Sequence, residues 1–392
     1  MSFYLSPINS ITMILKPLLN LLCLSLPFLP HHITAISLPA PTGPNLIGTY
    51  DFFITDETRN DIFAPTPEPR RIIMTLYYPT TFTYTNFPHP DYVSAAMATY
   101  YETIQNLPNG TFKSITTNSY YGSPVKSQKV KIILLSTGFG VSRHVYATLA
   151  EDLASHGYLV AALDATYDSP IVEFPDGKVA VAHLPENRVN ITKEETAKYY
   201  NERVKDALFV VKSLSMASFT SVIPGVGEKG LEVEKTGIFG HSLGGAASAG
   251  AMAAEDSILG GVSLDGRLIG NVIKSGLEKP FILFGAEGHN RTTDETWKGF
   301  WDSPSKGWKR ELLLKGSAHL TFSDLAPLAE IPGLKNLFPK EEIEGLVGTI
   351  GGLRAMAIQR VYLKAFFDKA LGHSNGELFD GADPNYPEIS FT

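Results

Sequence analysis

The sequence predicts an α/β fold in which helices cover both faces of a mostly parallel sheet. From residue 130 onward, short apolar, β-branched runs alternate with longer amphipathic segments, an order typical of parallel sheets. The chain has 392 residues, of which 44% are hydrophobic and 19% charged, and this length is ample for a full core. We find no internal repeat and no convincing linker. Residues 38–392 are therefore predicted to form a single domain, large enough for an enzyme.

The first 37 residues are predicted to be a signal peptide. Lys16 precedes an apolar stretch at 17–30 that is too short and too rich in proline to span a bilayer. Ala35 and Ser37 supply small residues at positions −3 and −1 of a cleavage site. The alternative interpretation of this segment is a disordered tail or a membrane anchor.

Further features agree with a secreted, extracellular glycoprotein. Cleavage would remove the only cysteine, Cys23, so the mature chain would have no disulfide. N-glycosylation sequons lie at Asn109, Asn190 and Asn290. The net charge of −7 and the lack of a basic run argue against nucleic acid as a partner. The start codon (Met1 or Met13) and the oligomeric state stay open.

The first part of the mature chain predicts two strands and a helix. The strands are expected at 48–56 and 70–80, near an edge of the sheet, with a proline-rich segment between them. Apolar residues then recur at helical spacing up to the turn at 108–110, namely at Val93, Met97, Tyr101 and Ile104. This apolar stripe could contact a lipid surface, but packing on the core is favoured.

The remaining elements alternate between strand and helix. We expect them at 130–136 (strand), 140–157 (helix), 158–165 (strand), 193–215 (helix), 236–240 (strand), an alanine-rich helix after residue 242, 260–265, 280–287 and 309–316 (strands) and 353–372 (helix). A long loop is expected from residue 166 to 192.

One serine lies where the strand 236–240 leads into the alanine-rich helix. The residues from Gly240 to Gly244 read Gly-His-Ser-Leu-Gly, which matches the G-x-S-x-G pattern of a nucleophile elbow. Such a sharp turn presents the hydroxyl of Ser242, and Gly240 and Gly244 leave room for the helix to cross close to the strand. The motif predicts an α/β-hydrolase fold with Ser242 as nucleophile. The alternative is a glycine-rich turn that contains an ordinary serine.

A serine nucleophile needs a histidine base and an acid that orients the histidine, and in this fold they follow the serine in the order acid, histidine. His319 is the best base because it lies in the loop after the last predicted strand. The other histidines considered have less suitable positions: His156, His241, His289 and His373. Asp265 and Glu287 each end a strand, and the residues alone leave both open as the acid.

The expected oxyanion hole consists of two backbone N–H groups. One belongs to Leu243, the residue after the nucleophile, and the other to Phe139 in the loop after strand 130–136.

With these residues placed, the chain resembles the secreted platelet-activating-factor acetylhydrolases, especially their fungal members, from about residue 44 to 370. The matching stretches are "LYYPT", "STGFGVSRHVYATLAEDLASHGYLVAALD", "IFGHSLGGA", "GVSLDG" and "GSAHLTFSDL". The resemblance implies Asp265 as the acid and His319 as the base. Two positions differ from the family: Thr137 replaces a histidine before Gly138, and Arg267 replaces an aromatic residue that relatives often carry.

The activity that this resemblance implies is calcium-independent hydrolysis of a short or oxidised sn-2 acyl ester in a phospholipid, with no cofactor and no metal. We see no carboxylate cluster at ion-binding spacing. A cutinase-like or polyester hydrolase, or an esterase for a secondary metabolite, is the alternative within esterases. An inactive hydrolase-fold binding protein is the alternative of another class.

Overall fold

The computed structural model describes residues 36–82, 86–182, 191–332, 334, 339–372 and 374–392. Its strands are β1 (Ile36–Ser37), β2 (Leu46–Asn60), β3 (Pro69–Thr80), β4 (Ile115–Thr116), β5 (Tyr120–Tyr121), β6 (Lys129–Ser136), β7 (Leu159–Leu163), β8 (Ile171–Glu173), β9 (Val179–Val181), β10 (Glu232–His241), β11 (Ile258–Leu264), β12 (Phe281–Ala286), β13 (Lys309–Leu314) and β14 (Ile389–Phe391). The predicted signal peptide up to residue 35, both candidate start codons, Asn190 and His373 lie outside the described residues.

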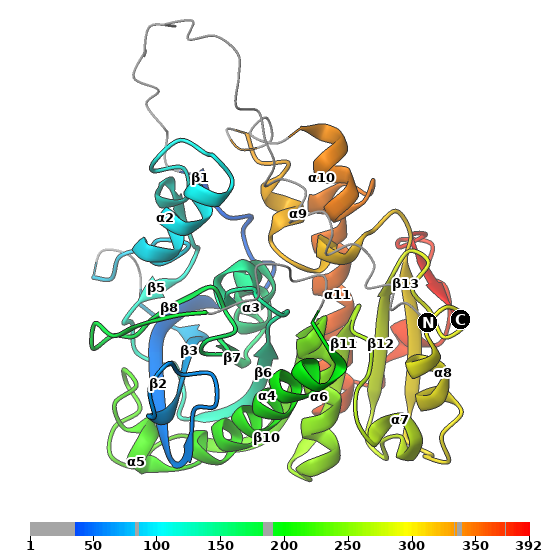
Figure 1. Cartoon of the computed structure of the whole chain (residues 1–392), viewed down its shortest axis with the longest axis horizontal. Coiled ribbons are helices and arrows are strands. Elements are labelled where there is room, and N and C mark those ends of the chain that lie inside the picture. Colours follow the sequence, from blue (N-terminus) through cyan, green and yellow to red (C-terminus); the bar gives the residue numbers. More distant parts are fainter. Residues whose placement is uncertain (1–35, 83–85, 183–190, 333, 335–338, 373) are drawn as a thin grey trace, which may run out of the picture.

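Ten of these strands form one sheet in the order β14-β13-β12-β11-β10-β6-β7-β3-β2-β5 (Figure 1). All neighbouring pairs from β7 to β13 are parallel. The pairs β2–β3, β3–β7 and β13–β14 are antiparallel. The carboxyl ends of six adjacent strands therefore point to the same edge, and the predicted mostly parallel α/β fold is confirmed.

The helices are α2 (Ala95–Ile104), α3 (Ala147–Ser155), α4 (Lys193–Leu214), α5 (Ala217–Thr220), α6 (Leu243–Ala254), α7 (Val272–Ser275), α8 (Glu295–Trp301), α9 (Leu325–Leu328), α10 (Lys340–Val347) and α11 (Gly352–Ala370). Two apolar clusters lie on opposite faces of the sheet. One packs α3 and α11 against it, and the other packs α4, α6 and α8. Figure 1 shows α4 and α6 side by side on their face. None of the helices in the described residues is long and apolar enough to cross a bilayer.

Strand β6 shows how the sequence places these two layers. Its side chains alternate between the faces: Ile133 and Leu135 belong to the cluster under α3, and Ile132 and Leu134 to the cluster under α4. Because successive side chains of a strand point to opposite faces, a fully apolar run is what a strand covered on both sides requires.

The stripe predicted between residues 93 and 104 packs on the protein core. Val93 and Met97 are buried there, whereas Tyr101 and Ile104 are half-buried. Helix α2 itself begins after Ser94, whose hydroxyl accepts a hydrogen bond from the N–H of Met97.

The expected helix over 140–157 is shorter than predicted. A 3₁₀ turn, η2 (Arg143–Tyr146), precedes α3, and the backbone leaves helical geometry at Val145. Two tertiary interactions explain the break. The Arg143 side chain is paired with Asp164, and the Val145 carbonyl accepts a hydrogen bond from the N–H of Asp324 instead of a helical one.

The loop expected from 166 to 192 contains the antiparallel hairpin β8–β9, which the sequence analysis missed. Its turn has the sequence Phe-Pro-Asp-Gly-Lys at 174–178, and two short apolar runs flank it. This is a recognisable hairpin signal, since Asp-Gly favours a tight turn.

The N-terminal lead-in is held against the rest of the protein. β1 pairs with β4, and the N–H of Leu38 donates to the carbonyl of Thr116. The guanidinium of Arg360 in α11 donates to the carbonyl oxygens of Pro39 and Ala40. The segment from Ile36 to Ala40 thus lies on the face of the sheet that α3 and α11 cover.

Candidate active site

Ser242 occupies a one-residue bend between β10 and α6. Its backbone has φ 56° and ψ −122°, a conformation that is costly for a residue with a side chain. The N–H of Ser242 donates to the carbonyl of Leu264 at 2.8 Å, so the bend is fixed to the neighbouring strand β11. Strain of this kind is typical of the elbow that lifts a nucleophile out of a sheet.

The small residues around Ser242 are required by backbone packing. A Cβ atom on Gly240 would overlap the carbonyl group of Gly244, and one on Gly244 would overlap the carbonyl oxygen of Ser136 in β6. The first turn of α6 therefore lies directly on β10 and β6, which is what brings Ser242 to the carboxyl edge of the sheet.

Asp265 and His319 meet at the same edge. Asp265 follows β11, and its Oδ2 lies 2.6 Å from Nδ1 of His319, which begins the 3₁₀ turn η4 (His319–Phe322) after β13. Burial would raise the pKa of Asp265, but hydrogen bonds from two imidazoles hold it well below its usual range. Asp265 is thus kept as a carboxylate, which accepts a hydrogen bond from Nδ1–H of His319.

Glu287, the other candidate acid, lies apart from this pair. It is exposed, and its carboxylate accepts a hydrogen bond from the backbone N–H of Gly316 at 2.8 Å. Its own N–H donates to the hydroxyl of Ser317 at 3.3 Å. These contacts connect the loops after β12 and β13, and no hydrogen bond between described residues joins Glu287 to His319.

His319 contacts His241, the residue that precedes Ser242. The two imidazole rings lie 4.6 Å apart, and Nε2 of His241 is 2.9 Å from the carbonyl oxygen of His319. Among the described residues, the Ser242 hydroxyl has no hydrogen-bond partner. Contacts between nucleophile and base often tighten only when substrate binds.

The protonation of His241 follows from its partners. The carbonyl oxygen of His319 only accepts, so Nε2 of His241 carries a proton. Burial lowers the pKa of His241 to about 3, so the ring is neutral and its Nδ1 accepts. Tyr146 Oη, 2.9 Å away, donates to that nitrogen and itself accepts from the N–H of Gly138 at 3.0 Å. These contacts join the loop that bears Phe139 to His319.

The two candidate oxyanion donors follow Gly138 and Ser242 in the chain. Leu243 is the first residue of α6, and Phe139 lies in the loop after β6. No hydrogen bond within the described residues uses either N–H as its donor. Phe139 packs its half-buried ring against Tyr199 of α4, with the ring centroids 4.8 Å apart.

Arg203 and Asp168 bind the backbone of the loop around Phe139. Both are buried. The Arg203 guanidinium donates to the carbonyls of Thr137 at 2.6 Å and Gly138 at 3.0 Å, while Asp168 accepts from the N–H of Gly140 at 2.8 Å and pairs with Arg203. The ion pair of Arg203 and Asp168 thus supports this loop. The loop includes Thr137, the position where the similar family usually has a histidine.

The turn that carries His319 is anchored at several points. Thr321 donates to the carbonyl of Val347 at 2.6 Å, and its own carbonyl accepts from Gln359 of α11 at 3.0 Å. Asp324, buried five residues after His319, accepts hydrogen bonds from Thr148 of α3 and from Tyr92 at 3.1 Å. These contacts fix His319 relative to the sheet.

A second histidine, His289, also contacts Asp265; the sequence analysis had considered it only as a less suitable base. Its Nδ1 lies 2.7 Å from Oδ1 of Asp265, and its Nε2 lies 2.9 Å from Oδ2 of Asp294. The position of His289 in the sequence could have predicted this contact. His289 lies three residues after β12, and β12 pairs in parallel with β11, the strand that Asp265 follows.

Other predicted positions lie around the site or away from it. Arg267 is partly exposed, and its Nε lies 3.3 Å from Asp294. His156 ends α3 and lies 3.0 Å from the Thr42 hydroxyl. Asn109 is exposed, whereas Asn290 is half-buried in the loop of His289. Among the described residues, no three His, Cys, Asp or Glu side chains are arranged as ligands for a metal ion.

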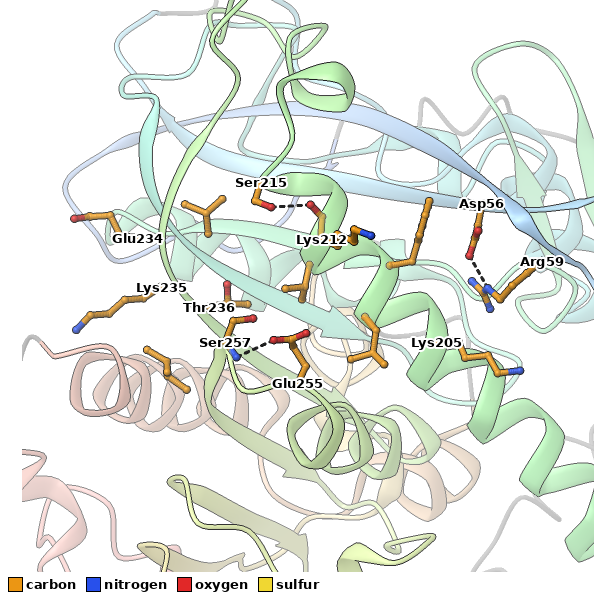
Figure 2. Close-up of a pocket in the computed structure, with 15 residues that line it drawn as sticks. Asp56, Arg59, Lys205, Lys212, Ser215, Glu234, Lys235, Thr236, Glu255 and Ser257 are labelled. Atoms are coloured by element: carbon orange, nitrogen blue, oxygen red, sulfur yellow. Dashed lines mark hydrogen bonds and ion pairs between the residues drawn. The ribbon is translucent and has the colours of Figure 1, made fainter.

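A separate groove of about 730 Å³ lies at the other end of β10 (Figure 2). It is bordered by Leu208 and Lys212 of α4, by Thr236 of β10 and by Glu255 after α6. Thr236 precedes Ser242 by six residues, which corresponds to roughly 20 Å along a strand. This groove is therefore distinct from the cluster around Asp265 and His319.

Comparisons with known proteins identify several similar chains. A family model described as "Platelet-activating factor acetylhydrolase, isoform II" matches residues 33–218. A "Probable 1-alkyl-2-acetylglycerophosphocholine esterase" of Arthroderma benhamiae is 30% identical over 272 residues, which cover 67% of this chain and 66% of the relative. The "Platelet-activating factor acetylhydrolase" of Canis lupus familiaris is 25% identical, with 54% of this chain and 52% of the relative covered.

The fold is also similar to that of a solved esterase. The "Ferulic acid esterase from Streptomyces cinnamoneus" superimposes with a TM-score of 0.78 at 30% identity, and the match covers 92% of this chain and 100% of that one. The curated relatives match over a shorter part, since the chain spans about two thirds of the fungal relative and about half of the dog relative.

Proposed function

The chain belongs to the platelet-activating factor acetylhydrolase family, and from this premise we propose that it is a serine esterase that hydrolyses the short sn-2 ester of platelet-activating-factor-like phospholipids. The observation that carries the proposal is the hydrogen bond of 2.6 Å between Asp265 and His319, at the sheet edge where Ser242 occupies a strained elbow.

The proposed reaction begins with attack by the Ser242 hydroxyl on the acyl carbonyl carbon. His319 accepts the hydroxyl proton on Nε2, while Asp265 holds Nδ1–H and stabilises the imidazolium that forms. Collapse of the tetrahedral intermediate breaks the ester bond, and His319 returns the proton to the departing glycerol oxygen. Water, activated by His319, then releases the acyl group from Ser242.

The oxyanion of the intermediate would accept hydrogen bonds from the N–H groups of Phe139 and Leu243. Both donors are unpaired within the described residues, and the ion pair of Arg203 and Asp168 holds one of them in place. Preorganised donors of this type are effective because they need no reorientation as charge develops, and each contributes roughly 3 kcal/mol.

The first test is the substitution Ser242→Ala. We expect release of acetate from a platelet-activating-factor analogue to fall to the uncatalysed level, with unchanged circular dichroism, because the alanine removes the nucleophile but not the elbow. A fluorophosphonate probe should label the unaltered protein and not the variant. Turnover or labelling retained by Ser242→Ala would refute the proposal, and absence of both from the unaltered protein would favour the inactive binding protein.

A second test compares the two candidate acids. Asp265→Asn should lower kcat by a factor on the order of 10⁴, because an amide at this position favours the wrong tautomer of His319. Glu287→Gln is the matched control, since it removes a carboxylate that only supports a backbone N–H. If Glu287→Gln were the damaging change, the assignment of the acid would be wrong.

A broader ester specificity is the second candidate function. The similarity to the ferulic acid esterase over 92% of the chain favours it, and it includes the polyester and secondary-metabolite esters expected as alternatives from the sequence. Comparison of kcat/KM for a short-chain phospholipid, an alkyl ferulate, p-nitrophenyl esters and a polyester film decides between the two. Preference for the phospholipid supports the first proposal.

We further propose that residues 1–37 are a signal peptide and that 38–392 form one secreted domain, glycosylated at Asn109, Asn190 and Asn290. The contacts of Leu38 with Thr116 and of Pro39 with Arg360 support a mature chain that keeps these residues, although β1 at 36–37 is paired in the same way. N-terminal sequencing of protein from the culture medium, before and after treatment with an N-glycosidase, tests both parts. Retention in the cell with an intact N-terminus would refute secretion.

A further inference from the structure

Asp265 lies between two imidazoles. Oδ2 accepts from His319 at 2.6 Å, whereas Oδ1 accepts from His289 at 2.7 Å and from the N–H of Ala286 at 2.8 Å. A triad needs only the first of these interactions. Asp265 is buried, and a buried carboxylate is stable only if its partners donate hydrogen bonds or carry positive charge.

Both ring nitrogens of His289 face carboxylate oxygens. Nδ1 lies 2.7 Å from Asp265 and Nε2 lies 2.9 Å from Asp294. An ionised carboxylate has no proton to donate, so both nitrogens must carry one, and the ring is an imidazolium. Burial alone would lower the pKa of His289, but the hydrogen bonds and charges of Asp265 and Asp294 outweigh it and raise the pKa to about 9.

The orientation of His289 is fixed by its surroundings. Its ring stacks on Trp297 of α8 with centroids 4.2 Å apart and planes inclined by 28°, an arrangement that favours a cation over the indole. Trp297 is fully buried, and its Nε1–H donates to the carbonyl of Gly266 at 2.8 Å. Asp294 is the N-cap of α8 and accepts from the N–H of Thr296 at 2.7 Å.

We propose that His289 is a positioning residue for the catalytic acid, a charged clamp that holds the Asp265 carboxylate with Oδ2 directed at His319. This inference rests on the proposed function. Because the clamp consumes one carboxylate oxygen, Asp265 has a single orientation available when His319 becomes charged. If His289 loses its proton, one of its nitrogens presents a lone pair to a carboxylate, and Asp265 or Asp294 must move away.

The charged and titratable groups that face the clamp come from four segments: Asp265 and Arg267 after β11, Glu287 and Arg291 in the loop of His289 itself, Asp294 at the start of α8, and His319 in η4. Nε of Arg267 lies 3.3 Å from Oδ2 of Asp294, the oxygen that His289 Nε2 also contacts. Glu287 is bound to Gly316, and Arg291 stacks on Trp301. Asp265 and Asp294 are therefore the direct partners that set the proton affinity of His289.

The clamp predicts an alkaline limit to turnover. We expect kcat to decline as the pH rises through about 9, where His289 loses its proton. Asp294→Asn removes one of the two negative charges and keeps a side chain that can still cap α8. It should move the midpoint of the decline to lower pH by about one unit. His289→Gln should lower the plateau by roughly tenfold to a hundredfold and abolish the decline.

The experiment measures kcat for acetate release between pH 6 and about pH 10 in the full secreted chain. His156→Gln is the matched control, since His156 also lies beside a carboxylate, Asp152, but away from the site; its profile should equal that of the unaltered enzyme. In parallel, ring ¹⁵N spectra of histidine-labelled protein, assigned with His289→Gln or, if that variant does not fold, by the shift in Asp294→Asn, should show His289 doubly protonated at neutral pH.

A profile that is flat to pH 10, a decline that Asp294→Asn leaves in place, or a neutral His289 ring at pH 7 would each overturn the inference. Failure of the proposed function is a different result, since Ser242→Ala would then keep its turnover or the unaltered protein would not react with the fluorophosphonate. Loss of activity in Ser242→Ala together with unchanged profiles in both His289→Gln and Asp294→Asn rejects the clamp alone.

Discussion

Tyr146 shows how one hydroxyl can connect two parts of an active site. It accepts from Gly138, beside the candidate oxyanion donor Phe139, and donates to His241, beside Ser242. A Cβ on Gly138 would lie 3.1 Å from both Tyr146 Oη and His241 Nδ1, so a side chain there would push these two groups by a few tenths of an ångström. The position of the loop that bears Phe139 therefore depends on the hydroxyl of Tyr146.

The substitution Tyr146→Phe tests this dependence. It leaves the N–H of Gly138 and Nδ1 of His241 without partners in a buried place, so we expect the free energy of unfolding to fall by about 1–3 kcal/mol. We also expect a lower kcat with little change in KM, because the loop that bears Phe139 loses a contact. Urea unfolding and steady-state kinetics measure the two effects.

Tyr386→Phe is a suitable control, since it removes a hydroxyl from a half-buried ring near the C-terminus. Equal losses of activity in the two variants would contradict a specific role for Tyr146.

At the scale of elements, the junction of β10 and α6 sets the geometry of the nucleophile. Gly244 allows the first turn of α6 to lie against β6, and Gly345 in α10 provides a contrast because nothing lies within 4 Å of a Cβ built there. The same substitution should therefore have opposite signs at the two positions.

Gly244→Ala is expected to destabilise the protein by about 1–3 kcal/mol or more, because the new methyl group overlaps the carbonyl of Ser136. Gly345→Ala should stabilise it by roughly 0.5–1 kcal/mol through a better helix propensity. Thermal unfolding of both variants checks the signs. A stable and fully active Gly244→Ala would show that the elbow tolerates a wider separation of helix and strand.

The elements that the sequence predicted correctly are those with a long, unambiguous pattern. The apolar strand β6 and the long helix α4, with its Thr192–Glu195 capping box, are examples. Periodicity failed where a tertiary contact competes with local preference: the helix over 140–157 breaks at Val145 because Asp324 takes its carbonyl. It also failed for short elements such as β8, β9 and α8, in which few residues carry the pattern.

For the site, position in the chain predicted more than residue type did. His319 was favoured because it follows the last predicted strand, whereas position left Asp265 and Glu287 equally open and only the resemblance to the family favoured Asp265. The structure brings Asp265 and His319 together at 2.6 Å. His289 satisfies a similar condition, but a triad leaves no role for a second histidine, so its contact with Asp265 was not expected. Side-chain partners such as Arg203 and Tyr146 could not be predicted, because they come from elements that are adjacent only in the folded chain.

At the scale of the whole molecule, Asp324 connects the base-carrying turn to α3 and to Tyr92. Burial raises the pKa of Asp324 to about 6, although the hydrogen bonds from Thr148 and Tyr92 act in the opposite direction. The folded protein thus holds this proton more tightly than the unfolded chain does. The contribution of protonated Asp324 to the free energy of unfolding is therefore present at low pH and is lost as the pH rises through about 6.

Asp324→Asn should remove this pH dependence. The free energy of unfolding of the unaltered protein, minus that of the variant, is expected to fall by about 2 kcal/mol between about pH 4 and pH 7. Urea midpoints at several pH values measure the difference, and exposed Asp380, changed to asparagine, serves as the control. A difference that stays constant with pH, or that grows, would contradict the assignment.

The bonds from Arg360 to Pro39 and Ala40 join residues that are 321 and 320 positions apart in the chain. During biosynthesis the acceptors emerge first and must wait for the donor. At 5–20 residues per second this interval is on the order of tens of seconds. The bonds to Arg360 therefore form late, after the contacts of the same segment with Thr116 and Asp152 have already become possible.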